Sequence, residues 1–188
     1  MKKPKLKILE PEKKVGLVIV MTGEGKGKTT SALGIALRAA GYGLRVCIIE
    51  FIKGDMYSGE LDGIKKLFPY AEIHLMGKGF CGVKGDKYSY QDHRAKAQEA
   101  LRLAKKKISS RKIDILVLDE INYAVKLKLV DLPQVLELIE NKPLRMHLVL
   151  TGRGAHREVI KRAHTVTEMK EIKHAFKSRI EPQKGIDY

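Results

Sequence analysis

The sequence predicts an α/β fold in which a mostly parallel β-sheet carries helices on both faces. Short β-branched segments alternate with helical patterns along the 188 residues, and this alternation is typical of βαβ units. The strand-like segments are apolar at consecutive positions, as expected for strands buried on both sides. The first of them, Leu17–Met21, leads into a glycine-rich loop and then a helix, which is the local context of a phosphate-binding loop.

The expected strands follow one another along the chain as short aliphatic segments bounded by polar or glycine-containing stretches. They are Leu17–Met21, Arg45–Phe51, Glu72–Met76, Ile113–Leu118, Met146–Thr151 and Thr165–Met169.

Three helices are expected between these strands. One follows the phosphate loop and ends near Gly41, a residue suited to a left-handed C-cap. The next spans Tyr88–Ile108, where apolar residues recur at spacings of four, three and four and so form one buried stripe. The stripe consists of Ala97, Leu101, Ala104 and Ile108. The last runs over about Leu132–Glu140, with Asp131 as its N-cap.

Length and composition predict one globular domain. A chain of 188 residues with 44% hydrophobic residues can bury one core and is short for two. We assign the domain to residues 15–188 and regard residues 1–14, which are rich in lysine, as a basic extension whose helical continuity Pro4 and Pro11 would break. The extension does not resemble a signal peptide, and no apolar segment is long enough to span a bilayer. We therefore expect a cytoplasmic protein that is not bound to a membrane.

The formal net charge of +15 is compatible with several kinds of ligand. Such an excess suits nucleic acid, an anionic membrane or small polyanions. The lysines are dispersed, and aromatic residues, the stacking platforms for bases, make up only 6% of the chain. A solvated basic surface is therefore favoured over a nucleic-acid track.

The glycine-rich loop is predicted to bind nucleotide phosphates. It reads Thr22-Gly23-Glu24-Gly25-Lys26-Gly27-Lys28-Thr29. Its glycines let successive N–H groups and the helix N-terminus surround an anion. Lys28 is expected to neutralise the phosphates and Thr29 to bind Mg²⁺. A standard loop of this kind begins with glycine where this chain has Thr22, so the direction in which the phosphates lie remains open at this point.

Further polar residues follow other expected strands. Asp119 and Glu120 come directly after Ile113–Leu118, at the edge where open parallel sheets bind ligands. Asp119 is placed to share a Mg²⁺ ion with Thr29, and Glu120 is a candidate for orienting water, for the metal or for a helix cap. Arg153, in the segment Leu148–Gly154, would bring a guanidinium to the same edge, where it could bind phosphate or carboxylate.

A second glycine-rich segment, Gly77–Gly85, follows another strand and places Phe80 between glycines. Its ring could contact a flat ligand. The two cysteines, Cys47 in an expected strand and Cys81 in this loop, indicate neither a disulfide framework nor a zinc site, and the six histidines show no metal-binding spacing. No protein nucleophile is evident, so the attacking group is expected to belong to the second substrate.

Several motifs together resemble the cob(I)alamin, or cob(I)yrinic acid a,c-diamide, adenosyltransferases. They are T-G-E-G-K-G-K-T-T-S-A from Thr22, F-I-K-G at Phe51–Gly54, G-F at Gly79–Phe80, V-L-D-E-I-N-Y-A from Val117, L-T-G-R-G from Leu150, T-E-M-K-E-I-K-H-A-F from Thr167 and Q-K-G-I-D-Y from Gln183. The resemblance runs in order from about Val15 to Tyr188. It implies a homodimeric RecA-like P-loop enzyme that transfers the 5′-deoxyadenosyl group of ATP to the Co(I) of a reduced corrinoid and releases triphosphate.

The resemblance also implies roles for individual residues. Lys28, Thr29 and Glu120 would be catalytic, and the Mg²⁺ ligands would be Thr29, Asp119 and Glu120. Contacts to ATP or the corrinoid would come from Thr22, Gly23, Glu24, Gly25, Lys26, Gly27, Lys28, Thr29, Thr30, Arg38, Phe80 and Arg153. Among these, Arg38 matches an arginine near the ribose or phosphates, and Phe80 matches an aromatic residue of the corrin pocket. The reductant is left open, with a flavoprotein as the candidate.

The chain departs from the family pattern after Phe80. Family members carry a tryptophan two residues later, whereas this chain has Gly82 there and no tryptophan at all. We therefore expect the lower axial ligand of the corrinoid to be controlled differently. The main alternative is a RecA-like ATPase acting on nucleic acid, with Glu120 orienting water. It accounts for the charge but not for the C-terminal motifs. A nucleoside kinase and a non-catalytic nucleotide-binding regulator are further alternatives.

Overall fold

The computed structural model describes residues 13–54 and 57–188, which form one α/β unit around a six-stranded sheet. Most of the predicted basic extension lies outside the described residues. The strands are β1 (Val18–Thr22), β2 (Val46–Glu50), β3 (Ala71–Leu75), β4 (Ile115–Asp119), β5 (His147–Thr151) and β6 (Thr165–Glu168). The helices are α1 (Lys28–Gly41), α2 (Gly59–Lys65), α3 (Tyr90–Ser110), α4 (Ile121–Lys126), α5 (Leu132–Asn141), α6 (Arg157–Arg162) and the 3₁₀ helix η1 (Ala175–Ser178).

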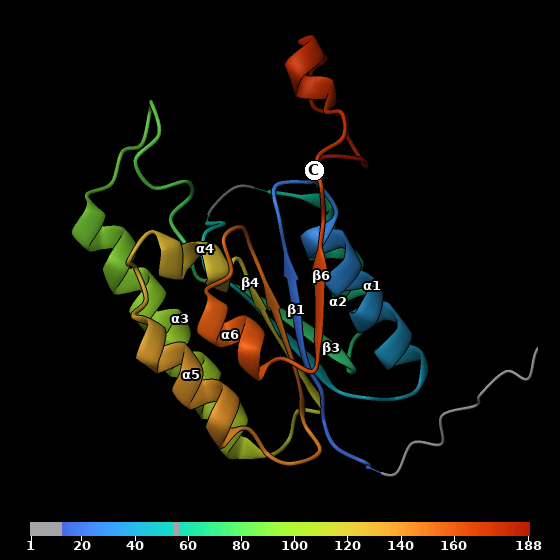
Figure 1. The fold of residues 1–188 in the computed structure, drawn as a ribbon. Coiled ribbons are helices and arrows are strands. Elements are labelled where there is room, and N and C mark those ends of the chain that lie inside the picture. The colour runs from blue at the N-terminus through green and yellow to red at the C-terminus, as the bar shows by residue number, and fades with distance from the viewer. Residues whose placement is uncertain (1–12, 55–56) are drawn as a thin grey trace, which may run out of the picture.

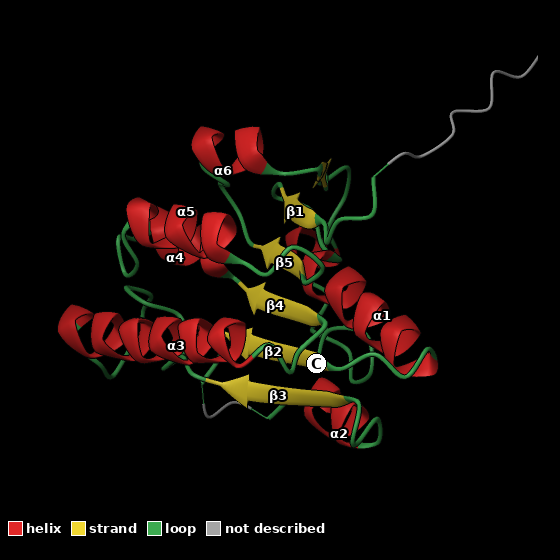
Figure 2. Cartoon of the chain, turned by 90° about the horizontal axis from the view of Figure 1, so that it is seen from below, coloured by secondary structure: helices red, strands yellow, loops and turns green. Residues whose placement is uncertain are grey.

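The sheet is parallel at every pairing, with the order β3-β2-β4-β5-β1-β6. Helices α1 and α2 cover one face, and α3 to α6 cover the other (Figure 2). Each face has its own apolar core, built on α1 in one case and on α3 and α5 in the other. The prediction of a parallel α/β fold with helices on both faces is therefore confirmed.

The ends of the sheet differ from its centre. Strands β2, β4 and β5 are almost wholly buried, whereas all four residues of β6 are exposed. The chain therefore leaves the sheet along an uncovered edge. Residues beyond β6 and the loop between β3 and α3 both extend past the carboxyl edge of the sheet (Figure 1).

All six predicted strands occur, each within one or two residues of its expected bounds. The predicted stripe on α3 is buried. This helix begins two residues later than expected because Ser89 and Asp92 form a reciprocal capping box. The predicted cap of α5 is also a capping box, formed by Asp131 and Gln134.

The predicted end of α1 near Gly41 is confirmed, but the left-handed cap predicted at that residue is wrong. Gly41 is the last helical residue of α1, and the left-handed residue that follows is Gly43, with φ 71°. The short helices α2, α4 and α6, of six or seven residues, were not predicted. Two turns of helix are too few to display a clear 3.6-residue period, and such helices depend on tertiary packing. Among the described residues, no helix is long and apolar enough to cross a membrane.

Candidate active site at the carboxyl edge of the sheet

The loop between β1 and α1 forms a closed cradle. Gly23 (φ 92°) and Gly27 (φ 103°) adopt left-handed conformations that favour glycine. The Lys28 ammonium donates hydrogen bonds to the carbonyl oxygens of Gly23 (2.8 Å) and Gly25 (2.6 Å). Burial lowers the pKa of Lys28. The lysine is thus buried within the loop.

Thr22, the unusual first residue of the loop, connects it to two neighbouring segments. Its hydroxyl oxygen accepts a hydrogen bond from the N–H of Ala155 (3.1 Å), and its carbonyl accepts one from Met169 (2.8 Å). The N–H of Gly25 in turn donates to the Met169 carbonyl (2.7 Å). A Cβ atom at Gly23 would lie 2.4 Å from that same oxygen. The loop therefore needs glycine because the chain after β6 packs directly on it.

Asp119 lies behind the loop at the end of β4. One of its carboxylate oxygens accepts hydrogen bonds from the hydroxyl groups of Thr29 (3.0 Å) and Thr151 (2.6 Å). The Thr151 hydroxyl oxygen also accepts one from the Glu120 N–H (2.9 Å). Burial raises the pKa of Asp119. The predicted pair of Thr29 and Asp119 is thus brought together in space.

Glu50, which the sequence reasoning missed, lies beside Asp119. It is the last residue of β2 and pairs in register with Asp119 of β4. Glu50 is fully buried, and neither carboxylate oxygen has a hydrogen-bond partner among the described residues. The Lys53 ammonium lies 3.8 Å from it but is also paired with Glu60. Burial raises the pKa of Glu50 to about 7.

This acidic group fits a divalent cation. Glu50 and Asp119 are buried carboxylates with raised pKa values, and the Thr29 hydroxyl is within 3.2 Å of both Asp119 oxygens. Hard oxygen donors of this kind are the ligands that Mg²⁺ prefers. A cation next to Asp119 would also add to the positive charge of Lys53, which Glu50 shares with Glu60. The donor set is therefore suitable for Mg²⁺.

Glu120 and Arg153 border the cavity in front of the loop. Glu120 has a left-handed backbone (φ 60°) at the start of α4, and burial raises its pKa. Arg153 lies 3.4 Å from Glu24 of the phosphate loop. Gly152 allows the end of β5 to lie close to the start of α4, because a Cβ there would lie 3.1 Å from the Glu120 carboxylate and 2.9 Å from the Tyr123 nitrogen.

The cavity has a volume of about 560 Å³. Besides Glu120 and Arg153, its lining comprises Glu24, Gly25, Lys26, Gly27, Lys28, Thr29, Thr30, Leu33, Lys53, Gly59, Glu60, Gly185, Ile186, Asp187 and Tyr188. Most of the predicted nucleotide-binding residues therefore meet at one site. Arg38 is an exception: it lies in the last turn of α1 and is exposed, about 15 Å along the helix from Lys28. Its role stays a prediction.

Phe80 lines a separate cavity of about 400 Å³ within the loop between β3 and α3. Its side chain is 56% exposed. Asp86 closes this loop by accepting hydrogen bonds from the N–H groups of Gly82 (2.8 Å) and Tyr88 (3.1 Å), which lowers the pKa of Asp86 to about 2. The buried His93 of α3 lies 3.0 Å from both Asp86 oxygens. The loop that carries Phe80 is therefore anchored at its base while Phe80 stays accessible.

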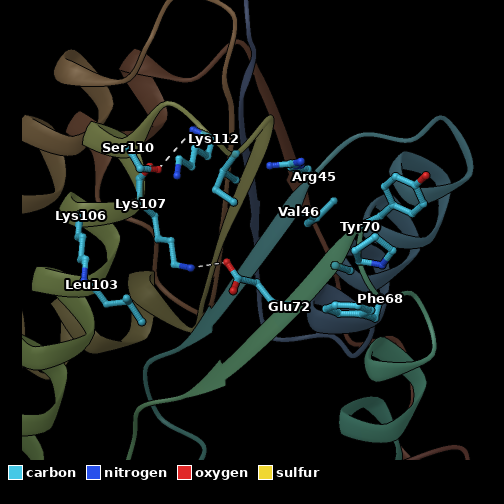
Figure 3. Close-up of a pocket in the computed structure, with 13 residues that line it drawn as sticks. Arg45, Val46, Phe68, Tyr70, Glu72, Leu103, Lys106, Lys107, Ser110 and Lys112 are labelled. Carbon is cyan, nitrogen blue, oxygen red and sulfur yellow. Dashed lines mark hydrogen bonds and ion pairs between the residues drawn. The ribbon is translucent and has the colours of Figure 1, made fainter.

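Within residues 13–54 and 57–188, two groups of side chains could each reach one metal ion, although the sequence spacing indicated none. They are Cys47 with Glu72 and His74, and Cys81 with Asp86 and His93. Glu72 is already paired with Lys107. That ion pair lies in a cavity of about 510 Å³ at the amino ends of the strands, on the opposite edge of the sheet from the phosphate loop (Figure 3). The absence of a zinc site stays a prediction.

Comparison with known proteins identifies the family. The sequence profile of the ATP:corrinoid adenosyltransferases BtuR/CobO/CobP matches residues 14–188. The chain belongs to this family. It is therefore classed with the ATP:corrinoid adenosyltransferases, which are transferases, and the predicted resemblance is confirmed.

Individual relatives support the same assignment. A corrinoid adenosyltransferase from Pseudomonas aeruginosa is 38% identical over 97% of this chain and 88% of its own length. The corrinoid adenosyltransferase of Escherichia coli K12 and the corrinoid adenosyltransferase CobA of Salmonella typhimurium are each 34% identical, over 97% of this chain and 90% of their own lengths. Likeness at this level extends over nearly the whole length of each protein.

One solved structure supports the fold of this adenosyltransferase. A KaiC-like protein from Pyrococcus horikoshii superposes with a TM-score of 0.51, at 18% identity, over 85% of this chain and 75% of that one. This likeness concerns the RecA-like P-loop fold alone.

Two features of this adenosyltransferase's site, the buried Glu50 beside Asp119 and the C-terminal lining of the cavity, escaped the sequence reasoning. Glu50 is the last residue of an apolar strand, as Asp119 is. This shared position in the sequence could have identified Glu50 as a site residue. The segment Gly185–Tyr188 lines the cavity although it is more than 150 residues from the phosphate loop in sequence, and only its place in a family motif set it apart.

Proposed function

We propose that the protein transfers the 5′-deoxyadenosyl group of ATP to the Co(I) of a reduced corrinoid and releases triphosphate. The observation that carries this proposal is the closed glycine cradle, whose cavity also contains Glu120 and Arg153 and whose neighbouring loop presents an accessible Phe80. Family membership gives the substrate classes.

The reaction needs no nucleophile from the protein. The lone pair of Co(I) attacks the ribose 5′-carbon, a cobalt–carbon bond forms, and the bond between that carbon and the triphosphate oxygen breaks. The triphosphate leaves with the electron pair. The protein's work is to hold the 5′-carbon in line with the cobalt and to stabilise the negative charge that develops on the leaving group.

The phosphate loop is suited to the leaving group. Its backbone N–H groups and the N-terminus of α1 would face the triphosphate oxygens. Lys28 exchanges its bonds to the Gly23 and Gly25 carbonyls for bonds to phosphate, which explains why it is kept in the loop. Arg153 would exchange Glu24 for phosphate in the same way. In this assignment Thr30 binds phosphate next to Thr29.

Mg²⁺ would be held by Thr29 and Asp119, with Glu120 at the front of the cluster. When bound, the ion supplies positive charge to the triphosphate. Thr151 holds the Asp119 carboxylate in place through a 2.6 Å hydrogen bond. Because that carboxylate is buried, its charge acts strongly on a neighbouring cation.

The loop over Gly77–Tyr88 would contact the corrinoid. Phe80 offers an accessible ring to the macrocycle, and the anchor formed by Asp86 and His93 limits how far the loop can move. A ring held against the lower face favours displacement of the axial base. Gly82, where the family pattern implies a tryptophan, leaves this task to fewer aromatic groups.

We further propose a homodimer, a separate flavoprotein reductant and a cytoplasmic location, with the transferase domain at residues 15–188. Support for the dimer comes from large apolar side chains that stay exposed beyond β6: Ile172 is 88% and Phe176 is 73% exposed. Nucleic acid is not proposed as a partner.

A spectroscopic assay tests the proposed reaction. Reduced corrinoid and MgATP are mixed with the protein, and formation of a light-sensitive cobalt–carbon bond is followed together with triphosphate release. Lys28→Ala should lower the rate by at least about a hundredfold, whereas the matched change at an exposed lysine on the opposite edge, Lys106→Ala, should not. Release of inorganic phosphate on addition of DNA or RNA, without corrinoid, would instead support an ATPase.

A further inference from the structure

The chain beyond β6 leaves the phosphate loop and later returns to it. It starts from Met169, which is hydrogen-bonded to Thr22 and Gly25. It then extends past the sheet through η1, and its end comes back beside β6 (Figure 1). There Asp187 forms an ion pair with Lys26 of the phosphate loop. Both ends of this excursion are therefore fixed on the same loop.

The returning segment, Gln183–Tyr188, is an ordered turn. The Asp187 carboxylate accepts a hydrogen bond from the Gln183 N–H (2.8 Å), and the Asp187 N–H donates to the Gln183 carbonyl (2.8 Å). The Gly185 N–H donates to the carbonyl of Tyr188 (2.8 Å), and Gly185 has a left-handed φ of 79°. Asp187 thus shapes the turn and fastens it to Lys26, which sets the positions of Ile186 and Tyr188.

A nucleotide bound in this cavity needs an apolar surface for its base, and the phosphate loop does not supply one. Its other lining residues are glycines or carry charged or hydroxyl side chains, with the exception of Leu33, Ile186 and Tyr188. Ile186 is 78% exposed and Tyr188 is 51% exposed, although both line the cavity. A purine base is flat and largely apolar on its faces, so it is bound by aromatic or aliphatic contacts.

We propose that the Gln183–Tyr188 turn forms the base-binding wall of the nucleotide site. Tyr188 and Ile186 contact the adenine from one side, and Leu33 of α1 contacts it from the other. Asp187 acts as a positioning residue because it acts through the turn that it holds against Lys26. This inference rests on the proposed function only for the identity of the nucleotide.

Binding measurements can separate the base from the phosphates. Affinities for MgATP and for magnesium tripolyphosphate, which lacks base and sugar, are measured by calorimetry without corrinoid. Stacking on an aromatic side chain is a large part of base affinity, so Tyr188→Ala should weaken MgATP binding about five- to thirtyfold. Tripolyphosphate affinity should stay within about twofold. Tyr42→Ala, a matched change at an exposed tyrosine at the far end of α1, should affect neither ligand.

The ratio of the MgATP affinity to the tripolyphosphate affinity tests the positioning role of Asp187. Asp187→Asn should lower the preference for MgATP over tripolyphosphate, whereas Asp187→Glu, which keeps the charge, should retain that preference. An unchanged MgATP affinity in Tyr188→Ala would overturn the inference. So would an equal loss for both ligands, or tighter binding of both, which would mean that the turn only competes with the nucleotide. Because corrinoid is absent, failure of adenosyl transfer would not by itself affect these outcomes.

Discussion

At the scale of single residues, Glu50 makes the metal-free protein sensitive to pH. Its pKa rises from the ordinary value of 4.5 to about 7 because the carboxylate is buried. The folded protein therefore holds a proton between these pH values that the unfolded chain has lost. The free energy of unfolding should fall as pH rises from about 4.5 to about 7, by up to about 3 kcal/mol, and level off above this range.

Glu50→Gln tests this effect. In metal-free protein, the free energy of unfolding of the variant should not fall between pH 4.5 and 7. At pH 8 the variant should be more stable than wild type, as measured by urea unfolding. Added Mg²⁺ should stabilise the wild type more than the variant, because the ion compensates the carboxylates. Glu137→Gln, at an exposed glutamate of α5, serves as the control. A wild-type stability that is flat over this pH range would contradict the interpretation.

We expect Phe80 to distinguish corrinoid substrates with a bound lower base from those without one. If its ring displaces the lower axial base, Phe80→Ala should slow adenosylation of corrinoids with a bound base about tenfold and leave base-free corrinoids nearly unchanged. Initial rates of wild type and variant with each type of corrinoid show how much the substitution slows each reaction. Equal losses on both would assign Phe80 to general binding. With glycine at position 82, the aromatic groups that line the cavity of this loop are Phe80 and Tyr88.

At the scale of elements, close backbone contacts hold the active-site loops together. A Cβ at Gly77 would lie 2.1 Å from the Ile52 carbonyl oxygen, and one at Gly54 would lie 2.7 Å from the Gly77 oxygen. The loop after β2 and the loop after β3 therefore pack backbone against backbone. This contact positions the Phe80 loop relative to the Lys53 segment, and it explains why the motif F-I-K-G ends in glycine.

Gly77→Ala should accordingly destabilise the protein by about 1–3 kcal/mol, because neither backbone can move away without disturbing a strand end. Gly63→Ala in α2 is the matched control, since nothing lies within 4 Å of a Cβ there and alanine favours helix by about 1 kcal/mol. Thermal unfolding of both variants tests the contrast. Equal melting temperatures for the two variants would show that the loops can separate at no cost.

At the scale of the whole molecule, the parallel sheet brings the carboxyl ends of β1, β2, β4 and β5 to one edge. The Glu50 and Asp119 carboxylates, the Thr151 hydroxyl and the phosphate loop meet there because parallel strands end on the same side. The excess of positive charge is spread over both edges, as the lysines around the cavity at the amino ends of the strands show (Figure 3). We therefore expect substrate binding to depend on local geometry rather than on the net charge.

The apolar excursion beyond β6 bears on oligomeric state. If a second copy covers Ile172 and Phe176, sedimentation should give a mass near twice 21.2 kDa, and Phe176→Glu should shift the protein toward the monomer by placing a charge in the interface. A monomeric wild type at micromolar concentration would contradict the proposed homodimer.

The sequence by itself determined the strands, the long helices, the phosphate loop and the family. Each of these depends on residues close together in the sequence: short, consecutively apolar segments for the strands, the buried stripe on α3, and glycines next to Lys28 and Thr29. The pairing of Thr29 with Asp119 was also predictable, because both follow strands of one parallel sheet.

Only the tertiary structure decided what surrounds that loop. The burial of Glu50 depends on its neighbour in β4, and the ion pair of Lys26 with Asp187 joins residues 161 positions apart. No periodicity links such residues, because their contact results from the return of a whole segment rather than from local chain geometry. For the same reason, the need for glycine at positions 23 and 77 became evident only when the backbones packed against them were located.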